Sequence, residues 1–403
     1  MLKIKRNVWA LGLTSFFNDV SSEMIMVILP LFLTSLGASR AVIGLIEGVA
    51  EATASFLKIL SGWLSDQLGK RKMLIGLGYT LSTLTKPLIA LANSWPLVLF
   101  VRFTDRVGKG VRNSPRDALV ADSTEPSERG LSFGFHRAMD TAGAVVGTLL
   151  ASLFLYYFSG HLKMELMTQY RTVFWLSVIP GLLSVLTIVF LVKDLPRSGT
   201  KDEGRGTKGG FYRGFTPFLV VMGFFQLANF SYALFILRAA DLGVVPYLIP
   251  IIYLVYNLVY VFCSVPLGQL SDKLGRKRVL SYGFLVLAFL LSGFALATQT
   301  WQAWPLFAVY GIVSAITEST PRAFVSDLAA PEIRGTAYGI YYALIGVTAL
   351  PASALAGWLW DFYGPANGPI VAFGFGTLMA LIATALLLYL VPDQQLKTKG
   401  QAV

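Results

Sequence analysis

Long apolar segments recur along this chain and constrain its fold more than any other feature. A helix that crosses the hydrocarbon core of a bilayer needs about 20 predominantly apolar residues. Only 14% of the 403 residues are charged, whereas about a quarter of the residues of a soluble protein are. The sequence therefore predicts an all-α membrane protein. The twelve expected transmembrane helices lie at about 8–33, 41–64, 73–92, 96–121, 131–157, 171–192, 215–237, 245–270, 279–298, 303–327, 335–360 and 369–391.

Lys and Arg residues gather in alternate connections between these segments, which predicts the orientation of the chain. They are dense at 3–6, 70–72 and 276–278, and again through 193–213. Basic residues in short loops mark the cytoplasmic side of a membrane protein. We therefore expect both termini in the cytoplasm and a multi-pass protein of the bacterial inner (plasma) membrane.

Several kinds of chemistry lack the residues that they need. The single cysteine, Cys263, rules out disulfides within the chain, and two histidines, His136 and His161, are too few for a zinc site. No phosphate-binding G-x-x-x-x-G-K-[ST] motif occurs. The net charge of +11 comes from short basic clusters between apolar segments. We therefore expect no metal, no cofactor, no nucleic-acid partner and no enzymatic activity.

The chain contains an internal repeat. The segment G-W-L-S-D-Q-L-G-K-R-K at 62–72 recurs as G-Q-L-S-D-K-L-G-R-K-R at 268–278, and Ser-Pro-Arg at 114–116 recurs as Thr-Pro-Arg at 320–322. Each half contains six predicted spans, an even number, so both halves would insert with the same orientation, and the solute path is expected between them. We expect an N-terminal six-helix bundle (1–192), a cytoplasmic linker (193–214) and a C-terminal six-helix bundle (215–403).

The repeated segment resembles the signature loop of the major facilitator superfamily (MFS), and Arg106-Val-Gly-Lys-Gly110 is similar to the Arg/Gly motif of the same family in its fourth span. The resemblance covers nearly the whole chain. It implies the MFS fold, two parallel-repeat six-helix bundles that rock about a central solute site, in a functional monomer. In that family the loop clamps the cytoplasmic face when the carrier opens outward. By resemblance, the conformational gate comprises Gly62, Asp66, Gly69, Arg71, Arg112, Arg116, Gly268, Asp272, Gly275 and Arg276.

Ionisable residues lie inside the predicted spans of the first half. A charge at the centre of a bilayer costs at least a few kcal/mol, so each one needs a partner, a wet cavity or a function. A carboxyl group removed from water can take up and release a proton near neutral pH. Asp19, and after it Glu23 and Glu51, are therefore the candidates for proton coupling.

The second half carries aromatic and amide residues at the corresponding positions, so it is expected to supply much of the contact surface for the solute. The candidate cavity residues are Asn18, Glu47, Arg102, Arg106, Gln226, Asn229, Tyr253, Asn257, Tyr260 and Glu318. A simpler interpretation is that the acids neutralise the basic residues of the fourth and fifth spans. It predicts pairing of Lys109 with Asp105 and of Arg137 with Asp140.

We therefore expect secondary active transport of a small organic solute by alternating access, in the form of proton-coupled efflux. Acids beside an aromatic cavity suit cationic or amphipathic compounds. The main alternative is uptake or exchange of an organic anion, bound by Arg102, Arg106 and Arg112. A membrane-embedded enzyme and a channel are more remote alternatives. The expected partners are a small-molecule substrate, protons and the lipid bilayer.

Two glycines in the predicted fifth span, Gly143 and Gly147, are four residues apart. Small residues at this spacing let two membrane helices approach closely. The family's antiporters often carry a longer Gly/Pro motif here, and this chain lacks its proline. The pair therefore predicts close helix packing, while the missing proline weakens the assignment as an antiporter.

Overall fold

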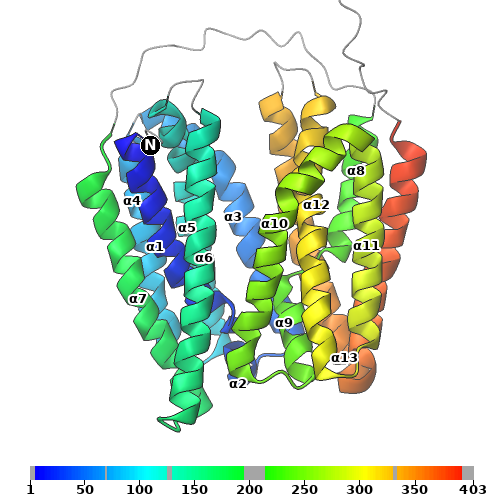
Figure 1. The fold of residues 1–403 in the computed structure, drawn as a ribbon, viewed down its shortest axis with the longest axis horizontal. Helices are drawn as coiled ribbons and strands as arrows, with labels where there is room; N and C mark the ends of the chain where they lie inside the picture. The colour runs from blue at the N-terminus through cyan, green and yellow to red at the C-terminus, as the bar shows by residue number, and fades with distance from the viewer. Residues whose placement is uncertain (1–4, 69, 125–128, 195–213, 330–333, 393–403) are drawn as a thin grey trace, which may run out of the picture.

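The computed structural model describes residues 5–68, 70–124, 129–194, 214–329 and 334–392, and these form helices in two groups that stand side by side (Figure 1). We call the described residues up to 194 the first half and those from 214 the second half. The first half contains α1 (Arg6–Met26), α2 (Leu29–Ser35), α3 (Arg40–Leu68), α4 (Arg71–Ala90), α5 (Trp95–Asp122), α6 (Arg129–Gly160) and α7 (Leu166–Leu191). The second half contains α8 (Phe215–Ala228), α9 (Tyr232–Asp241), α10 (Ile249–Leu274), α11 (Arg276–Leu296), α12 (Ala303–Asp327) and α13 (Arg334–Leu390), with short 3₁₀ turns at Pro246–Leu248 and Thr300–Gln302. Most of the predicted linker lies outside the described residues.

The regular helical backbone is interrupted at three places. The first span breaks between α1 and α2, and the seventh breaks between α8 and α9, where Ser231 caps α9 by accepting a hydrogen bond from the Ala233 amide at 3.2 Å. Irregular backbone at membrane depth is tolerated where it faces protein or a cavity. Within α13, Gly364 has a φ of +75°, and the chain turns back there. Such a φ is readily adopted only by glycine.

The described helices form twelve segments of membrane length, as the sequence predicted, when α1 with α2 and α8 with α9 are each taken as one interrupted span and α13 is divided at Gly364. Seven segments are long and apolar enough, by length and composition, to cross a membrane, and the last of them contains the two parts of α13. The other four helices of membrane length are α3, α4, α5 and α12. Of these, α3, α4 and α5 carry the buried charged residues Glu47, Lys86, Arg102, Arg106 and Arg112. The seven segments are Arg6–Ser35, Phe135–Gly160, Leu166–Leu191, Phe215–Asp241, Pro246–Ser264, Arg276–Leu296 and Ala337–Leu390.

The close packing predicted at Gly143 and Gly147 is confirmed, because both glycines lie against α1. A Cβ atom at Gly143 would sit 3.1 Å from the Cβ of Asp19, and one at Gly147 would sit 2.9 Å from the Cα of Val20. The two glycines therefore press α6 onto the helix that carries Asp19, and they fix the distance between these two elements.

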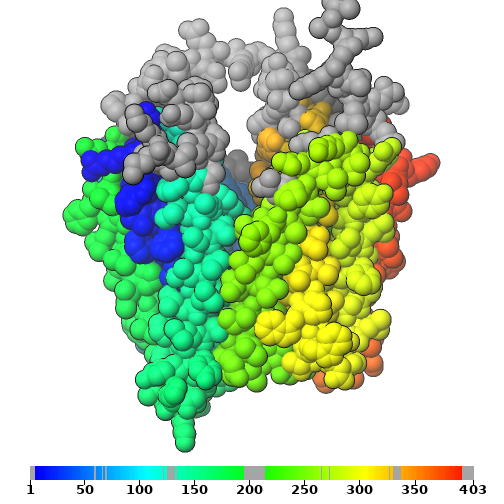
Figure 2. Space-filling model, in the orientation of Figure 1, coloured from blue at the N-terminus to red at the C-terminus, as the bar shows by residue number. Residues whose placement is uncertain are grey.

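The two halves meet tightly at the end of the molecule opposite the N-terminus. There α3 packs on α13 through small residues: a Cβ at Gly48 would lie 2.7 Å from the Cα of Leu350, and one at Gly357 would lie 2.9 Å from the Cα of Ala41. Ser152 of α6 also bridges the halves, because it donates to the carbonyl of Tyr247 in the 3₁₀ turn before α10, at 2.7 Å. At the end where the N-terminus lies, the surface is hollowed between the halves (Figure 2).

Replacing Gly147 by alanine should lower thermal stability by about 1–3 kcal/mol, because the added methyl group would overpack α6 against the backbone of α1. The matched control is Gly374→Ala in α13, where a Cβ atom meets nothing within 4 Å and the helix propensity of alanine is favourable. The midpoint of thermal unfolding of the purified variants measures both effects. Equal midpoints for the two variants would contradict the packing argument.

Candidate functional site

A cavity of about 560 Å³ lies between the halves, within the size range of small-molecule sites. Side chains from α1, α3, α5 and α6 form one wall, and side chains from α8, α9, α12 and α13 form the other. A second cavity of about 260 Å³, which we call the inner cavity, extends from it between α1, α3, α4 and α5. Among the described residues, no group of three or more His, Cys, Asp or Glu side chains is placed to hold a metal ion. The arrangement can therefore enclose a drug-sized organic molecule between polar and aromatic side chains.

A buried ion pair joins α3 to α5 beside both cavities. The guanidinium of Arg102 donates to both carboxylate oxygens of Glu47, at 3.0 and 3.1 Å, and the two side chains are 3% and 8% exposed. Asp105 lies 3.3 Å from Arg102 and 3.8 Å from Arg106. The predicted pairing of Asp105 with Lys109 was therefore wrong, because the acid points back along α5 towards Arg102. Glu47 nevertheless lines both cavities and Arg102 lines the inner one, as predicted, so the ion pair forms part of the cavity wall.

The three predicted proton-coupling acids gather around Lys109. Asp19 and Glu51 line both cavities, and Glu23 lines the inner one. Lys109 interacts electrostatically with all three carboxyl groups. Among the described residues, no nitrogen of a Lys, Arg or His side chain lies within 4 Å of any of these three carboxylates. One carboxylate oxygen of Glu23 is buried without a hydrogen-bond partner, whereas Asp19 accepts from the Asn18 amide at 2.9 Å. Lys109 is the cation common to all three acids, arginines of α5 act on them as well, and none of the three has an ion-pair partner within 4 Å among the described residues.

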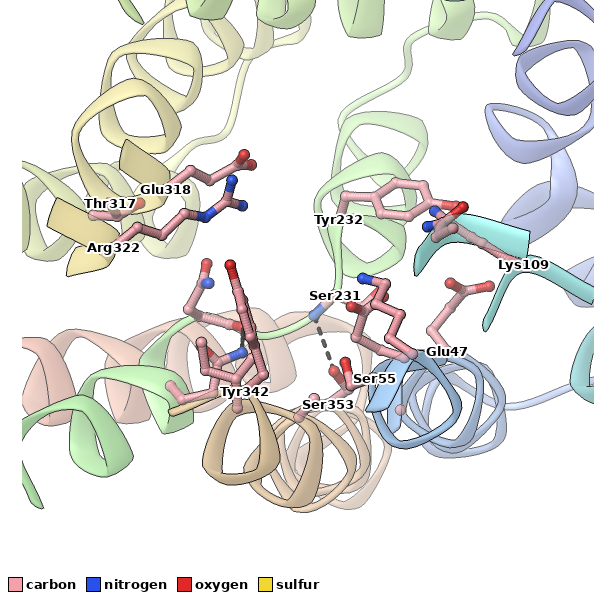
Figure 3. A pocket seen from close by; sticks show the side chains of 18 of the residues that line it. Glu47, Ser55, Lys109, Ser231, Tyr232, Thr317, Glu318, Arg322, Tyr342 and Ser353 are labelled. Atoms are coloured by element: carbon pink, nitrogen blue, oxygen red, sulfur yellow. Dashed lines mark hydrogen bonds between the residues drawn. The ribbon is translucent and has the colours of Figure 1, made fainter. Parts of the chain in front are cut away.

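The second half presents amide, aromatic and charged groups to the main cavity (Figure 3). Gln226, Asn229 and Glu318 line it as predicted, together with Tyr232 and Arg322, which the sequence analysis did not select. Arg322 was recognisable from the repeat, because it occupies the position of Arg116. Tyr232 had no such signal, since it enters the cavity only because the seventh span breaks before it.

Two predicted cavity residues do not line either cavity. The amide of Asn257 donates to the carbonyl of Tyr253 in its own helix at 3.2 Å. Tyr260 lies behind the wall, where its hydroxyl donates to Glu318 at 2.8 Å and accepts from Arg137 at 3.2 Å. Tyr253 itself lines the inner cavity, as does Arg106.

Arg137 reaches across to the second half, so the predicted partner within its own helix was wrong. Its guanidinium donates to Tyr260, and Asp140 instead has a carboxylate oxygen 3.6 Å from Nδ1 of His136. Sequence proximity on one helix favoured the local pair, but α10 packs against α6 and offers a hydroxyl that a one-helix argument does not see.

The predicted gate residues show a repeated ion pair. Arg71 at the start of α4 lies 3.2 Å from Asp122 at the end of α5, and Arg276 at the start of α11 lies 3.3 Å from Asp327 at the end of α12. Each pair stays within one half and ties two helix ends together.

The remaining gate predictions are not tested by this arrangement. A Cβ at Gly62 would lie 3.5 Å from Ser114, and one at Gly268 would meet nothing within 4 Å. Gly275 has a φ of +93°, and Arg112 and Arg116 line the main cavity. Gly69 and the side chains of Asp66 and Asp272 lie outside the described residues.

The opposite end of the cavity is closed by polar contacts between the halves. The guanidinium of Arg40 lies 2.8 Å from Asp241 and 5.1 Å from the ring centre of Trp360. The carboxylate of Asp361 accepts hydrogen bonds from the amides of Arg40 and Ala41 at 3.2 and 2.7 Å. The first amides of a helix have no partner within the helix, and a carboxylate there is stabilising. An acid of the second half therefore caps α3 of the first half.

The fold and cavity define a polytopic helical carrier with its site at the interface of two bundles. The sequence pattern of the Major Facilitator Superfamily matches residues 11–237 and 216–402. The chain is 37% identical over 394 residues to an uncharacterized MFS-type transporter of Methanocaldococcus jannaschii. The alignment covers 96% of each of the two chains. The chain belongs to the major facilitator superfamily. It is therefore a secondary transporter of a small molecule and a multi-pass integral membrane protein, and the prediction that it is not an enzyme is confirmed.

More distant similarities agree with this fold. The chain is 27% identical over 335 residues to the multidrug resistance protein MdtH of Cronobacter sakazakii. The alignment covers 82% of this chain and 80% of MdtH. The crystal structure of a bacterial homologue of the human lysosomal transporter Spinster, inward-facing and unoccupied, superposes with a TM-score of 0.78 at 18% identity, covering 96% and 97% of the two chains. The nucleoside transporter NupG gives a TM-score of 0.75 at 15% identity, covering 95% and 99%.

Replacing Arg102 by glutamine should destabilise the protein by about 3–5 kcal/mol, because it leaves the buried charge of Glu47 without a counter-ion. Adding Glu47→Gln should restore much of the loss, since the double variant has no uncompensated charge. Thermal unfolding of the two single variants and the double variant forms a double-mutant cycle. Additive effects of the two substitutions would show that the pair does not stabilise the fold.

Replacing Asp361 by alanine should shift the protein towards states that open at the closed end, by about 1 kcal/mol or roughly fivefold, because the cap of α3 is lost. Spin labels at Ser35 and Val245, introduced in a Cys263→Ser background, would report the distance across this end. Asp194→Ala, which removes an acid far from the closed end, is the control. An unchanged distance distribution in the Asp361 variant would rule out the cap as a closing contact.

Proposed function

We propose that this transporter exports a small organic solute in exchange for protons, by rocking of the two six-helix halves (1–192 and 215–403) about the cavity. The observation that carries the proposal is the group of three carboxyl groups, Asp19, Glu23 and Glu51, which face the cavities without a fixed counter-ion. Such groups can bind a proton when the cavity faces one side of the membrane and release it on the other. Proton uptake would then return the emptied carrier.

The direction of export is supported by two features. The basic connections predict that the termini are cytoplasmic, so the hollow at the N-terminal end would receive solute from the cytoplasm. Relatives of the chain carry the name multidrug resistance protein MdtH. We place the protein in the bacterial inner (plasma) membrane and propose that the monomer is the working unit, because each monomer contains a complete cavity between its own halves.

Uptake or exchange of an organic anion is the second candidate, and Arg106 favours it. Its side chain is 9% exposed and lines the inner cavity, its Nε atom has no hydrogen-bond partner, and one terminal nitrogen contacts the Met26 sulfur at 3.5 Å. A buried guanidinium that donates only to a sulfur atom has N–H groups left with which to bind a carboxylate. Loss of solute binding in Arg106→Ala, with Asp19 intact, would favour this candidate.

Asp19→Asn should abolish uphill transport driven by a pH gradient in proteoliposomes, because the amide cannot carry a proton, while exchange of solute without a gradient should persist. The solute would first be found by ligand-induced thermal stabilisation across a metabolite and drug panel. The matched control is Asp194→Asn, an acid outside both cavities. Undiminished uphill transport by the Asp19 variant would exclude this residue from coupling.

A further inference from the structure

Arg322 of α12 stands on the second-half wall of the main cavity, on the side opposite the three coupling acids. Figure 3 shows its guanidinium pointing into the cavity from the same helix as Glu318, facing the wall that carries Lys109 and Glu47. Beside aromatic and amide groups and the acid Glu318, Arg322 is the cationic side chain that the described part of the second half presents to the main cavity.

Two neighbouring arginines of the site have a carboxylate partner, and Arg322 has none among the described residues. Arg116, its repeat partner, lies 2.9 Å from Asp117, and Arg102 is held by Glu47. Among the described residues, no carboxylate oxygen lies within 4 Å of the guanidinium of Arg322. The residue after Arg322 is Ala323, where the first half has Asp117, so the second half keeps the arginine without the acid beside it.

Glu318, one helical turn before Arg322, does not fill the role of counter-ion. Its carboxylate accepts the hydroxyl of Tyr260 at 2.8 Å, and that hydroxyl accepts in turn from Arg137 of the first half at 3.2 Å. This chain of contacts holds the acid towards α10. The side chain of Arg322 is exposed to the cavity, and closure of the cavity around a solute would remove it from solvent. A charge taken out of water without a partner is strongly unfavourable.

We propose that Arg322 binds an anionic group, a carboxylate or a phosphate, of the transported solute. The guanidinium fork matches both groups with paired hydrogen bonds. The body of the solute would pack on the aromatic side chains of the same cavity, which are Phe225, Phe230, Tyr232, Tyr310, Tyr341 and Tyr342. This inference rests on the proposed function in taking the main cavity as the transport site. Because Asp19 and Glu51 lie on the other wall, the proton and the solute anion would occupy separate places.

Equilibrium binding to the full-length protein in phosphatidylcholine nanodiscs tests this assignment. The probes are 1-naphthylacetate with its neutral partner 1-naphthylacetamide, and 1-naphthyl phosphate with 1-naphthol, each titrated by the rise in the thermal unfolding midpoint. The wild type should bind at least one anion about 10- to 100-fold more tightly than the neutral partner, the factor expected for charge-assisted hydrogen bonds. Whichever anion shows the preference identifies the head group as carboxylate or phosphate.

Arg322→Gln should remove that preference and leave binding of the neutral probes intact, which also shows that the variant is folded. Arg322→Lys should keep part of it, and Arg6→Gln, an exposed arginine outside the cavity, should keep all of it. The proposal is overturned if the wild type binds neither anion more tightly than its neutral partner, or if Arg322→Gln retains the preference.

This assay uses no proton gradient, so its outcome is separate from that of the coupling experiment. Asp19→Asn should retain the anion preference while losing uphill transport. An anion preference without any proton-driven transport would refute the proposed coupling alone. Proton-driven transport without an anion preference would refute the role of Arg322 alone.

Discussion

The cost of placing ionisable groups at membrane depth governs how these helices are arranged. The charged helices α3 and α5 face each other, so that Arg102 at 3% exposure can share two hydrogen bonds with Glu47 at 8%. Apolar α7 stands on the outside, where Ile179 and Phe190 are 59% and 72% exposed, as suits a surface against lipid. The same cost sets where a cavity can form, because charges without a partner need water or a solute.

The two ends of the cavity are held by different interactions. At the closed end, small residues let α3 and α13 touch, and Asp361 caps α3 from the other half. At the N-terminal end, the ion pairs Arg71–Asp122 and Arg276–Asp327 each remain within one half. Contacts that bridge the halves can be exchanged while those within a half persist, which is the requirement for rigid bundles that rock about a central site.

The halves differ in the chemistry that they bring to the cavity. The first half contributes Lys109 and the acids near it, and the second contributes aromatic rings, amides, Glu318 and Arg322. In the proposed mechanism, protons are carried on one wall and the solute is selected on the other. Coupling would then arise because both walls move together, rather than from direct competition for one charged group.

The number of helices, the repeat, the family resemblance and the close approach at Gly143 and Gly147 could all be predicted from the sequence, because they depend on local apolar length, spacing and side-chain size. The sequence also indicated which acids lie within the spans. The partners of the buried charged side chains could be assigned only from the tertiary structure. Asp105 turned to Arg102, and Arg137 crossed to Tyr260, since an ion pair or hydrogen bond depends on which helices pack together. The exposure of Arg322 without a counter-ion likewise follows from the packing of α10 against α12, which engages Glu318 with Tyr260.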